Sequence, residues 1–192
     1  MQGSAASSAS LADLAATIRA RRTHMLVDRA REVPLELVTE LCELATWAPC
    51  HKRTWPWRFA LCTGDGRARL GRVAAEAMAA RGDDPAKVDK TRTKYLRTPA
   101  VLVVGSAPGD TTLRTAENRD AVAAGVQNAL LAATAAGLAS YWSSCPKGAG
   151  EPVAALCGFE AGTEIVAIVY LGFTTGHVEA PARPAVELTH LT

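Results

Sequence analysis

Apolar residues recur at helical spacing in several parts of this chain. Between residues 34 and 48, leucines and alanines follow the three- and four-residue spacing of one helix face, with a proline suited to the first turn. This spacing predicts an amphipathic helix that ends before Pro49. Similar patterns predict helices over residues 10–21, 66–81, 85–96 and 114–136.

Four segments have the pattern of β-strands. Residues 57–63 alternate large apolar side chains with smaller or charged ones, which is the period of two expected for a strand. Residues 100–104 and 165–171 are continuous apolar runs rich in β-branched side chains, which predicts central strands buried on both faces. Residues 138–145 are predicted to form a strand that follows Gly137, a residue suited to the left-handed end of a helix.

The order of these elements predicts an α+β fold, because the helices do not alternate strictly with strands as in a dinucleotide-binding sheet. Neither a GxGxxG sequence after a strand nor a GxxxxGK[ST] sequence is present. The helix over 114–136 is apolar nearly all round, which predicts burial on several sides. Its small residues would permit close helix approach, either inside the core or across a subunit interface.

Length and composition favour one globular domain. The chain has 192 residues, of which 48% are hydrophobic and 21% charged, values far from those of a disordered protein. We expect residues 1–9 to be a flexible tail and residues 10–192 to form a single domain. The absence of an apolar run of roughly 18 residues or of a basic and apolar leader predicts a cytoplasmic protein without a membrane partner.

Charge and cysteine content narrow the possible partners further. The net charge of +2 is too small for a nucleic-acid surface, and we interpret the basic runs at residues 19–31 and 87–97 as solvated helix faces. The five cysteines have no metal-ligand spacing, and their odd number argues against a closed disulfide framework. Cys50 and Cys145 could be exposed thiols, although small apolar fillers are the favoured interpretation.

The segment that begins at Trp47 carries candidate chemistry. A helix-ending proline, a polar loop with His51 and a Trp-Pro-Trp sequence would build an aromatic-walled corner. Upstream, Arg21 and Arg22 offer planar forks of donors that can hold a phosphate and donate to a ring carbonyl, and Thr23 adds a hydroxyl. These residues suit a flat aromatic ligand that carries a phosphate, but two adjacent arginines are also typical of a solvated helix end.

Six short segments occur in the order of a known family. They are Arg21-Arg22-Thr23, Ala48-Pro49-Cys50-His51-Lys52, Pro56-Trp57-Arg58-Phe59, Ala136-Gly137-Leu138, Trp142-Ser143-Ser144 and Tyr170-Leu171-Gly172. In this order the chain resembles the FMN-dependent nitroreductase family over nearly all of residues 11–184, and within it the compact YdjA-type subgroup. The resemblance implies a nitroreductase-like fold, with a mostly antiparallel sheet of about four to five strands flanked by helices. It also implies a swapped-arm homodimer with two FMN sites at the subunit interface.

The resemblance implies roles for basic residues at both ends of the chain. Arg21, Arg22 and Thr23 correspond to contacts with the flavin phosphate, the ribityl chain and the pyrimidine edge. Arg183, in Pro181-Ala-Arg-Pro184, resembles a second basic contact to the phosphate.

Further contacts implied by the resemblance come from two other segments. Trp47 and His51 resemble the segment that the other subunit contributes. The other segment, Trp142-Ser143-Ser144, resembles the strand end that lines the same flavin. Many relatives carry Asn and Gln where this chain has Arg53 and Trp55, so hydrogen bonding to the ring edge and the shape of the substrate mouth are expected to differ.

The function implied by the resemblance is that of an FMN-dependent oxidoreductase. A hydride would pass from NAD(P)H through the flavin to a small-molecule acceptor, such as a nitroaromatic or a quinone, in a ping-pong cycle. No catalytic side chain is required, although His51 could protonate the product, hold a positioning hydrogen bond or be merely structural. Two alternatives stay open: flavin fragmentation, deiodination or azoline oxidation on the same fold, or a non-catalytic flavin-binding protein.

Overall fold

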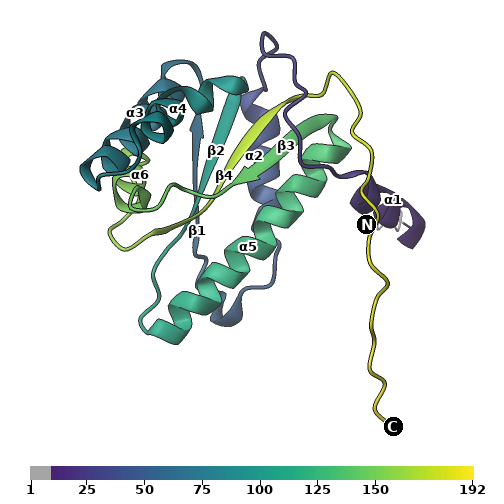
Figure 1. Cartoon of the computed structure of the whole chain (residues 1–192). Coiled ribbons are helices and arrows are strands. Elements are labelled where there is room, and N and C mark those ends of the chain that lie inside the picture. The colour runs from purple at the N-terminus through teal and green to yellow at the C-terminus, as the bar shows by residue number, and fades with distance from the viewer. Residues whose placement is uncertain (1–9) are drawn as a thin grey trace, which may run out of the picture.

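The chain folds around one antiparallel sheet with helices on both faces (Figure 1). The computed structural model describes residues 10–192, so the tail predicted over residues 1–9 lies outside the described residues. The strands of the sheet are β1 (Trp57–Cys62), β2 (Ala100–Ser106), β3 (Leu138–Ser143) and β4 (Glu164–Phe173). The spatial order is β1-β2-β4-β3, and each neighbouring pair is antiparallel. The predicted α+β class is confirmed, with four strands in the sheet.

The helices divide between the two faces of the sheet. The described residues form α1 (Leu11–Ala20), α2 (Leu35–Ala45), α3 (Gly64–Ala80), α4 (Pro85–Thr93), α5 (Thr112–Ala135) and α6 (Gly150–Leu156), with 3₁₀ turns η1 (His51–Arg53) and η2 (Lys94–Arg97). Helices α2 and α5 cover one face, whereas α3 and α6 cover the other and α4 packs on α3 (Figure 1). None of these helices is long and apolar enough to cross a membrane.

Local sequence explains most of the helix boundaries. Ser10 and Asp13 form a reciprocal capping box at the start of α1. Asp84 caps α4 and Pro85 occupies its first turn. Gly137 has a φ of 74°, the left-handed conformation that was expected for it after α5.

The structure corrects two of the predicted boundaries and adds one helix that was not predicted. The helix expected over 85–96 ends at Thr93 and continues as the tighter turn η2, and the strand expected over 138–145 ends at Ser143. Helix α6 was not expected at all, because seven residues with a glycine and a proline in the first turn carry no clear helical period.

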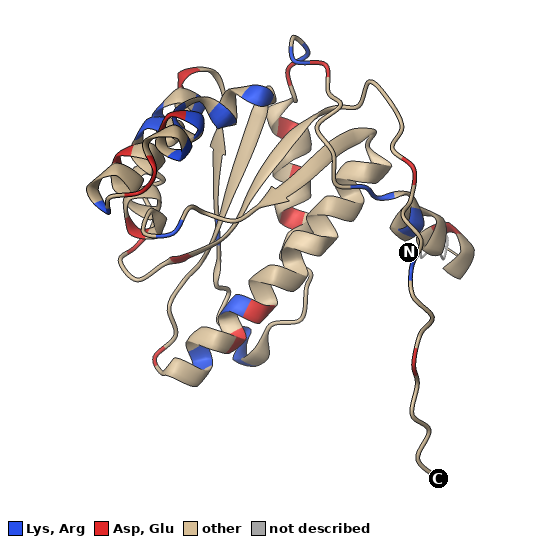
Figure 2. Ribbon diagram, in the orientation of Figure 1, with Lys and Arg blue, Asp and Glu red and all other residues tan. Residues whose placement is uncertain are grey.

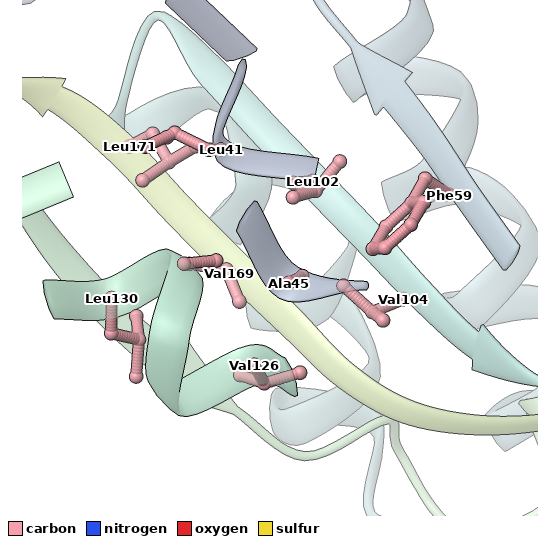
Figure 3. Close-up of a pocket in the computed structure, with 10 residues that line it drawn as sticks. Leu41, Ala45, Phe59, Leu102, Val104, Val126, Leu130, Val169 and Leu171 are labelled. Carbon is pink, nitrogen blue, oxygen red and sulfur yellow. The ribbon is translucent and has the colours of Figure 1, made fainter. Parts of the chain in front are cut away.

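The core between the sheet and helices α2 and α5 is closely filled. Figure 3 shows apolar side chains from the sheet, such as Leu102 and Val169, facing Leu41 of α2 and Leu130 of α5. The space left among them is about 10 Å³, room for one water at most. A Cβ on Gly125 would lie 2.6 Å from the carbonyl oxygen of Ala45, so α2 and α5 touch backbone to backbone. Among residues 10–192, the interior between this face and helices α2 and α5 is therefore filled by apolar side chains.

Candidate functional site

The segment that follows α1 lies along the free edge of β3. Thr23 pairs with Ser140 in a parallel β-bridge, and the backbone N–H of His24 donates to the carbonyl of Ser140 at 3.2 Å. Three residues separate Ser140 from Ser143, about 10 Å along a strand. The structure therefore brings two of the predicted parts together, the Arg-Arg-Thr segment and the end of β3.

The two arginines at this edge are half-buried and carry no carboxylate partner among the described residues. Arg22 Nη1 donates to the backbone carbonyls of Arg21 (2.8 Å) and Arg19, while Arg21 Nη1 donates to Thr23 Oγ1 at 3.3 Å. Arg22 Nε is buried and, within residues 10–192, has no hydrogen-bond partner. Ser140 Oγ, on the strand beside it, is in the same state.

Buried polar atoms in native structures nearly always have a partner. Among the described residues, the side chains of Trp57, Tyr95 and Thr163 carry unpartnered atoms as well. A guanidinium Nε–H and a hydroxyl are both donors to an anionic oxygen. The Arg-Arg-Thr segment and β3 thus each carry one buried donor without a partner among the described residues, and an anionic oxygen is one kind of partner for both.

The end of β3 presents one aromatic ring and two hydroxyls. The indole N–H of Trp142 donates to the carbonyl of Val166 at 3.3 Å, which fixes the ring against the sheet. Ser143 is half-buried and its hydroxyl donates to the carbonyl of Ser144 at 3.2 Å, whereas Ser144 is exposed. Because the N–H of Trp142 is already satisfied, this indole can serve a ligand only as an apolar wall.

Trp47 and His51 lie in a different part of the molecule. Trp47 follows α2 with 83% of its surface exposed, and His51 is exposed in η1. Their loop is tied to the first half of α5, because the hydroxyl of Thr54 donates to Asn118 Oδ1 at 2.5 Å. Asn118 is 3% exposed and donates from Nδ2 to the carbonyl of Ala107 at 3.1 Å.

The His51 loop and the Arg-Arg-Thr segment therefore sit toward opposite ends of α5. Asn118, which holds the His51 loop, is about 25 Å along the helix from Ala135 at its end. Strand β3, with Thr23 beside it, begins only three residues after Ala135. A single chain does not bring His51 to the arginines.

The His51 loop is also the most strained backbone among the described residues. Lys52, Arg53 and Trp55 all have positive φ values, of 59°, 53° and 50°. Non-glycine residues in this region cost on the order of 1–3 kcal/mol each and cluster at functional sites. Sequence reasoning singled out Arg53 and Trp55 as departures from the family, but nothing in their chemistry indicated a left-handed backbone.

Arg183 is exposed and makes no hydrogen bond or ion pair with the other described residues. It belongs to the C-terminal segment, which runs away from the sheet as extended chain without secondary structure (Figure 1). The structure of one chain therefore does not place Arg183 at the bridge between Thr23 and Ser140.

The cysteines contribute no reactive thiol to this region. Burial raises the pKa of Cys145 to about 11, opposed by the nearby charge of Lys94, so its thiol stays protonated at neutral pH. Cys50 is half-buried, with its sulfur 3.4 Å from Thr54 Oγ1. Both fit the filler interpretation. Across residues 10–192, no group of three His, Cys, Asp or Glu side chains is arranged to hold a metal ion.

Comparison with known proteins identifies the class. Residues 18–173 match the Nitroreductase family, so the chain belongs to that family and is an oxidoreductase. Over 126 residues it is 29% identical to "Putative NAD(P)H nitroreductase YdjA" of Escherichia coli K12, a match that covers 65% of this chain and 69% of the relative.

Solved structures agree with this assignment. The nitroreductase-like family protein from Bacillus cereus superposes with a TM-score of 0.74 at 30% identity, over 92% of this chain and 95% of that one. A nitroreductase with bound FMN from Bacteroides fragilis superposes with a TM-score of 0.75 at 20% identity, over 94% and 99% of the two chains. The expected family and the nitroreductase-like fold are thereby confirmed.

Proposed function

We propose that this chain binds FMN at the edge of β3 and uses NAD(P)H to reduce a small electrophile such as a nitroaromatic or a quinone. The observation that supports it best is the pair of buried, unpartnered donors, Arg22 Nε and Ser140 Oγ, beside the bridge between Thr23 and Ser140. FMN ends in a phosphate and carries ring carbonyls, which are the acceptors that these donors lack.

The roles of the residues follow from their positions. Arg21 and Arg22 hold the phosphate by charge-assisted hydrogen bonds, which are stronger at a half-buried site than in water. Ser143, about 10 Å along β3 from Ser140, and Ser144, just after the strand, would meet the ring edge. FMN held by these residues would supply the redox chemistry of hydride transfer between a nicotinamide and the acceptor. Trp142 excludes water on the apolar side.

The remaining predicted contacts come, in this proposal, from a second copy of the chain. The loop of His51 is tied to α5 about 25 Å from the end of that helix nearest β3, so in this proposal His51 and the exposed Trp47 complete the site of the partner. There His51 either positions the ring edge by a hydrogen bond or protonates the product. Arg183 reaches the partner's phosphate in the same way, on a C-terminal arm that is exchanged between the two copies.

Exposed apolar side chains support such a homodimer. They lie on α1, on the loop after α2 and on the C-terminal segment, and each is at least 48% exposed. These residues are Leu11, Leu14, Ile18, Trp47, Trp55, Val186, Leu188 and Leu191. Apolar surface of this extent on a soluble protein usually marks an interface. Obligate dimer interfaces bury roughly 2,000 Å² or more, so in this proposal α1 and the C-terminal segment both take part in the interface.

Rapid-mixing reduction by NADPH tests this function against its alternatives. If the nicotinamide and the acceptor stack on the flavin at the same position, one after the other, the kinetics follow a ping-pong cycle. Double-reciprocal plots are then parallel. If bound FMN cannot be reduced because Trp55 and Arg53 close the mouth, the chain is a flavin-binding protein without this activity. Reduction without transfer to nitroaromatics or quinones would favour another reaction on the same fold.

A further inference from the structure

The loop between α2 and β1 carries unpaired positive charge next to exposed aromatic surface. Residues 47–58 contain no Asp or Glu. Lys52 and Arg53 are exposed, and within residues 10–192 neither of them forms an ion pair. Trp55, two residues further along, is 59% exposed. Figure 2 shows basic residues on this loop where it passes the first half of α5.

Acidic side chains of the neighbouring helix do not neutralise this charge. Glu117 of α5 is paired with Arg114 at 2.7 Å. Asp120 follows Asn118 by two residues, which places it about 200° around the helix from the side chain that holds the loop. The two cations of the loop are therefore available to an anion from outside the chain.

The backbone of the loop is fixed at two points. The hydroxyl of Thr54 donates to Asn118 at 2.5 Å, and the carbonyl of Trp55 accepts from Arg58 Nη1 at 3.1 Å. Arg58 is itself held by Glu160, with Nε 2.8 Å from Oε2 and Nη2 2.6 Å from Oε1. Because both supports are made inside the chain, the loop is shaped before any ligand arrives.

Trp55 can serve as a stacking surface for a flat ring. Its ring centroid lies 6.2 Å from that of the buried Trp57, at an angle of 43°, which is within the usual range for an aromatic pair. The Cα atoms of Arg53 and Trp55 are at most about 7 Å apart, since two residues separate no further. A guanidinium offers a planar fork of donors that matches a carboxylate. A ring against Trp55 can therefore carry a carboxylate toward Arg53.

The backbone at Arg53 indicates that its side chain is kept for a function. Its φ of 53° lies in the left-handed region, which Asn and Gly tolerate much better than Arg. Strain of this kind is found mainly where it serves a site. An asparagine would suit the backbone better, but it would remove the charge.

We propose that Arg53 selects aromatic acceptors that carry a negative charge, with Trp55 as the stacking surface and Lys52 as a second cation. The assignment rests on the proposed function, which places this loop beside the flavin of the partner. The preferred acceptors are then nitroaromatics or quinones with a carboxylate or sulfonate group. These side chains bind and orient the acceptor and take no part in the hydride transfer.

Calorimetric titration of the purified holoprotein with benzoate and with benzamide tests the charge preference without any redox step. The two ligands have nearly the same shape and differ in charge. We expect Arg53→Asn to lower the ratio of benzoate affinity to benzamide affinity about tenfold, and Arg53→Lys to lower it less, because lysine keeps the charge without the fork. The matched control is Arg69→Asn, an exposed residue of α3 on the other face of the sheet.

Urea denaturation of the same variant separates binding from a merely structural role. Arg53→Asn should raise the urea midpoint, because asparagine accepts a positive φ more readily. A higher midpoint with an unchanged affinity ratio would mean that Arg53 shapes the loop only, and would overturn the proposal. An equal loss of affinity for benzoate and benzamide would overturn it as well.

Steady-state kinetics show whether the acceptor or the hydride donor meets the loop. The ratio of kcat/KM for 4-nitrobenzoate to that for 4-nitrobenzamide should fall about tenfold in Arg53→Asn. In the unsubstituted chain this ratio should also decline as salt is added, because salt screens exposed charges. A constant ratio with a raised KM for NADPH would assign the loop to the donor and contradict the acceptor assignment.

Failure of the two proposals can be told apart. A colourless protein that takes up no FMN would contradict the flavin function, whatever the titration gives. A yellow protein that NADPH reduces, but whose Arg53→Asn variant keeps both ratios of the unsubstituted chain, would contradict only the acceptor assignment.

Discussion

Thr54 and Asn118 are joined by a 2.5 Å hydrogen bond that fastens the strained His51 loop to α5. Asn118 is buried, and its Nδ2 donates to the carbonyl of Ala107. Its Oδ1 accepts the hydrogen bond from the hydroxyl of Thr54. This bond therefore balances part of the cost of three left-handed residues in the loop. It fixes the surface on which the proposed partner-facing residues, His51 and Trp47, are carried.

The change Thr54→Val should lower the free energy of unfolding by about 1–3 kcal/mol, because it leaves a buried amide oxygen unsatisfied. Urea denaturation measures this loss. The control is Thr39→Val, whose exposed hydroxyl bonds only its own helix backbone and whose loss should cost within about 0.5 kcal/mol. Equal effects of the two changes would show that the link to Asn118 carries no stability.

The change Arg22→Ala should weaken FMN binding about ten- to a hundredfold, because charge-assisted hydrogen bonds of about 1.5–3 kcal/mol are lost. Arg22→Lys keeps the charge but lacks the Nε donor, so we expect an intermediate affinity. Arg19→Ala is the control, since that side chain is exposed on α1. FMN fluorescence quenching gives the affinities. Unchanged binding in Arg21→Ala and Arg22→Ala alike would mean that the site assignment is wrong.

Replacing two glycines of α3 with alanine, one at a time, should change the stability of the chain in different ways. A Cβ on Gly71 would lie 2.9 Å from the carbonyl carbon of Arg92 and collide with its oxygen, whereas one on Gly66 would meet only Cys62 at 3.7 Å. Gly71→Ala must therefore push α4 away, and we expect a loss of about 1–3 kcal/mol or more. Gly66→Ala should be neutral or stabilising by up to about 1 kcal/mol. Thermal unfolding of both variants measures the contrast, and equal melting temperatures would contradict the close approach of α3 and α4.

The stability of the chain should decline as the pH falls below about 6.5, in part through His24. Burial, and then the charge of His177, lower the pKa of His24 in the folded state below its ordinary value of 6.5. Protonation is therefore easier in the unfolded chain, so this contribution is present above about pH 6.5 and is lost as the pH falls. We expect His24→Gln to flatten the fall in the urea midpoint between pH 7.5 and 5.5. An identical fall in the variant would exclude His24 as a source.

Light scattering of the purified protein should report twice the chain mass of 20.1 kDa. The motivation is the distance between the His51 loop and the arginines, together with the exposed apolar side chains of α1 and the C-terminal segment. Shortening the chain after residue 184 removes three of these side chains and should shift the equilibrium toward the monomer. A monomeric full-length protein with FMN bound would contradict the shared site.

Sequence patterns predicted the strands and most helices because their side chains repeat at the period of the element they form. Ile165 to Leu171 lie on a central strand buried on both faces, and such a run has few alternatives. Helix α6 escaped prediction because a seven-residue helix has too few turns to show a period. The left-handed backbone of Lys52 and Arg53 was not predicted, because neither residue type favours a positive φ.

The candidate site was predictable from sequence only in parts. The Arg-Arg-Thr segment and the end of β3 were both singled out, but their pairing through Thr23 and Ser140 depends on how the chain crosses the sheet edge. The basic run at residues 87–97 was interpreted as a solvated face. In the structure, Lys87, Lys90, Lys94 and Arg97 of this run line an open space between α4 and the ends of β3 and β4, with Tyr141, Ser143 and Tyr170 on its other side.

The absorption spectrum of the purified protein tests the central claim most directly. If Arg22 and Ser140 hold a flavin phosphate at the edge of β3, the protein is yellow, shows the visible flavin bands and releases FMN, not FAD, on denaturation. A colourless protein that does not take up added FMN would contradict the account.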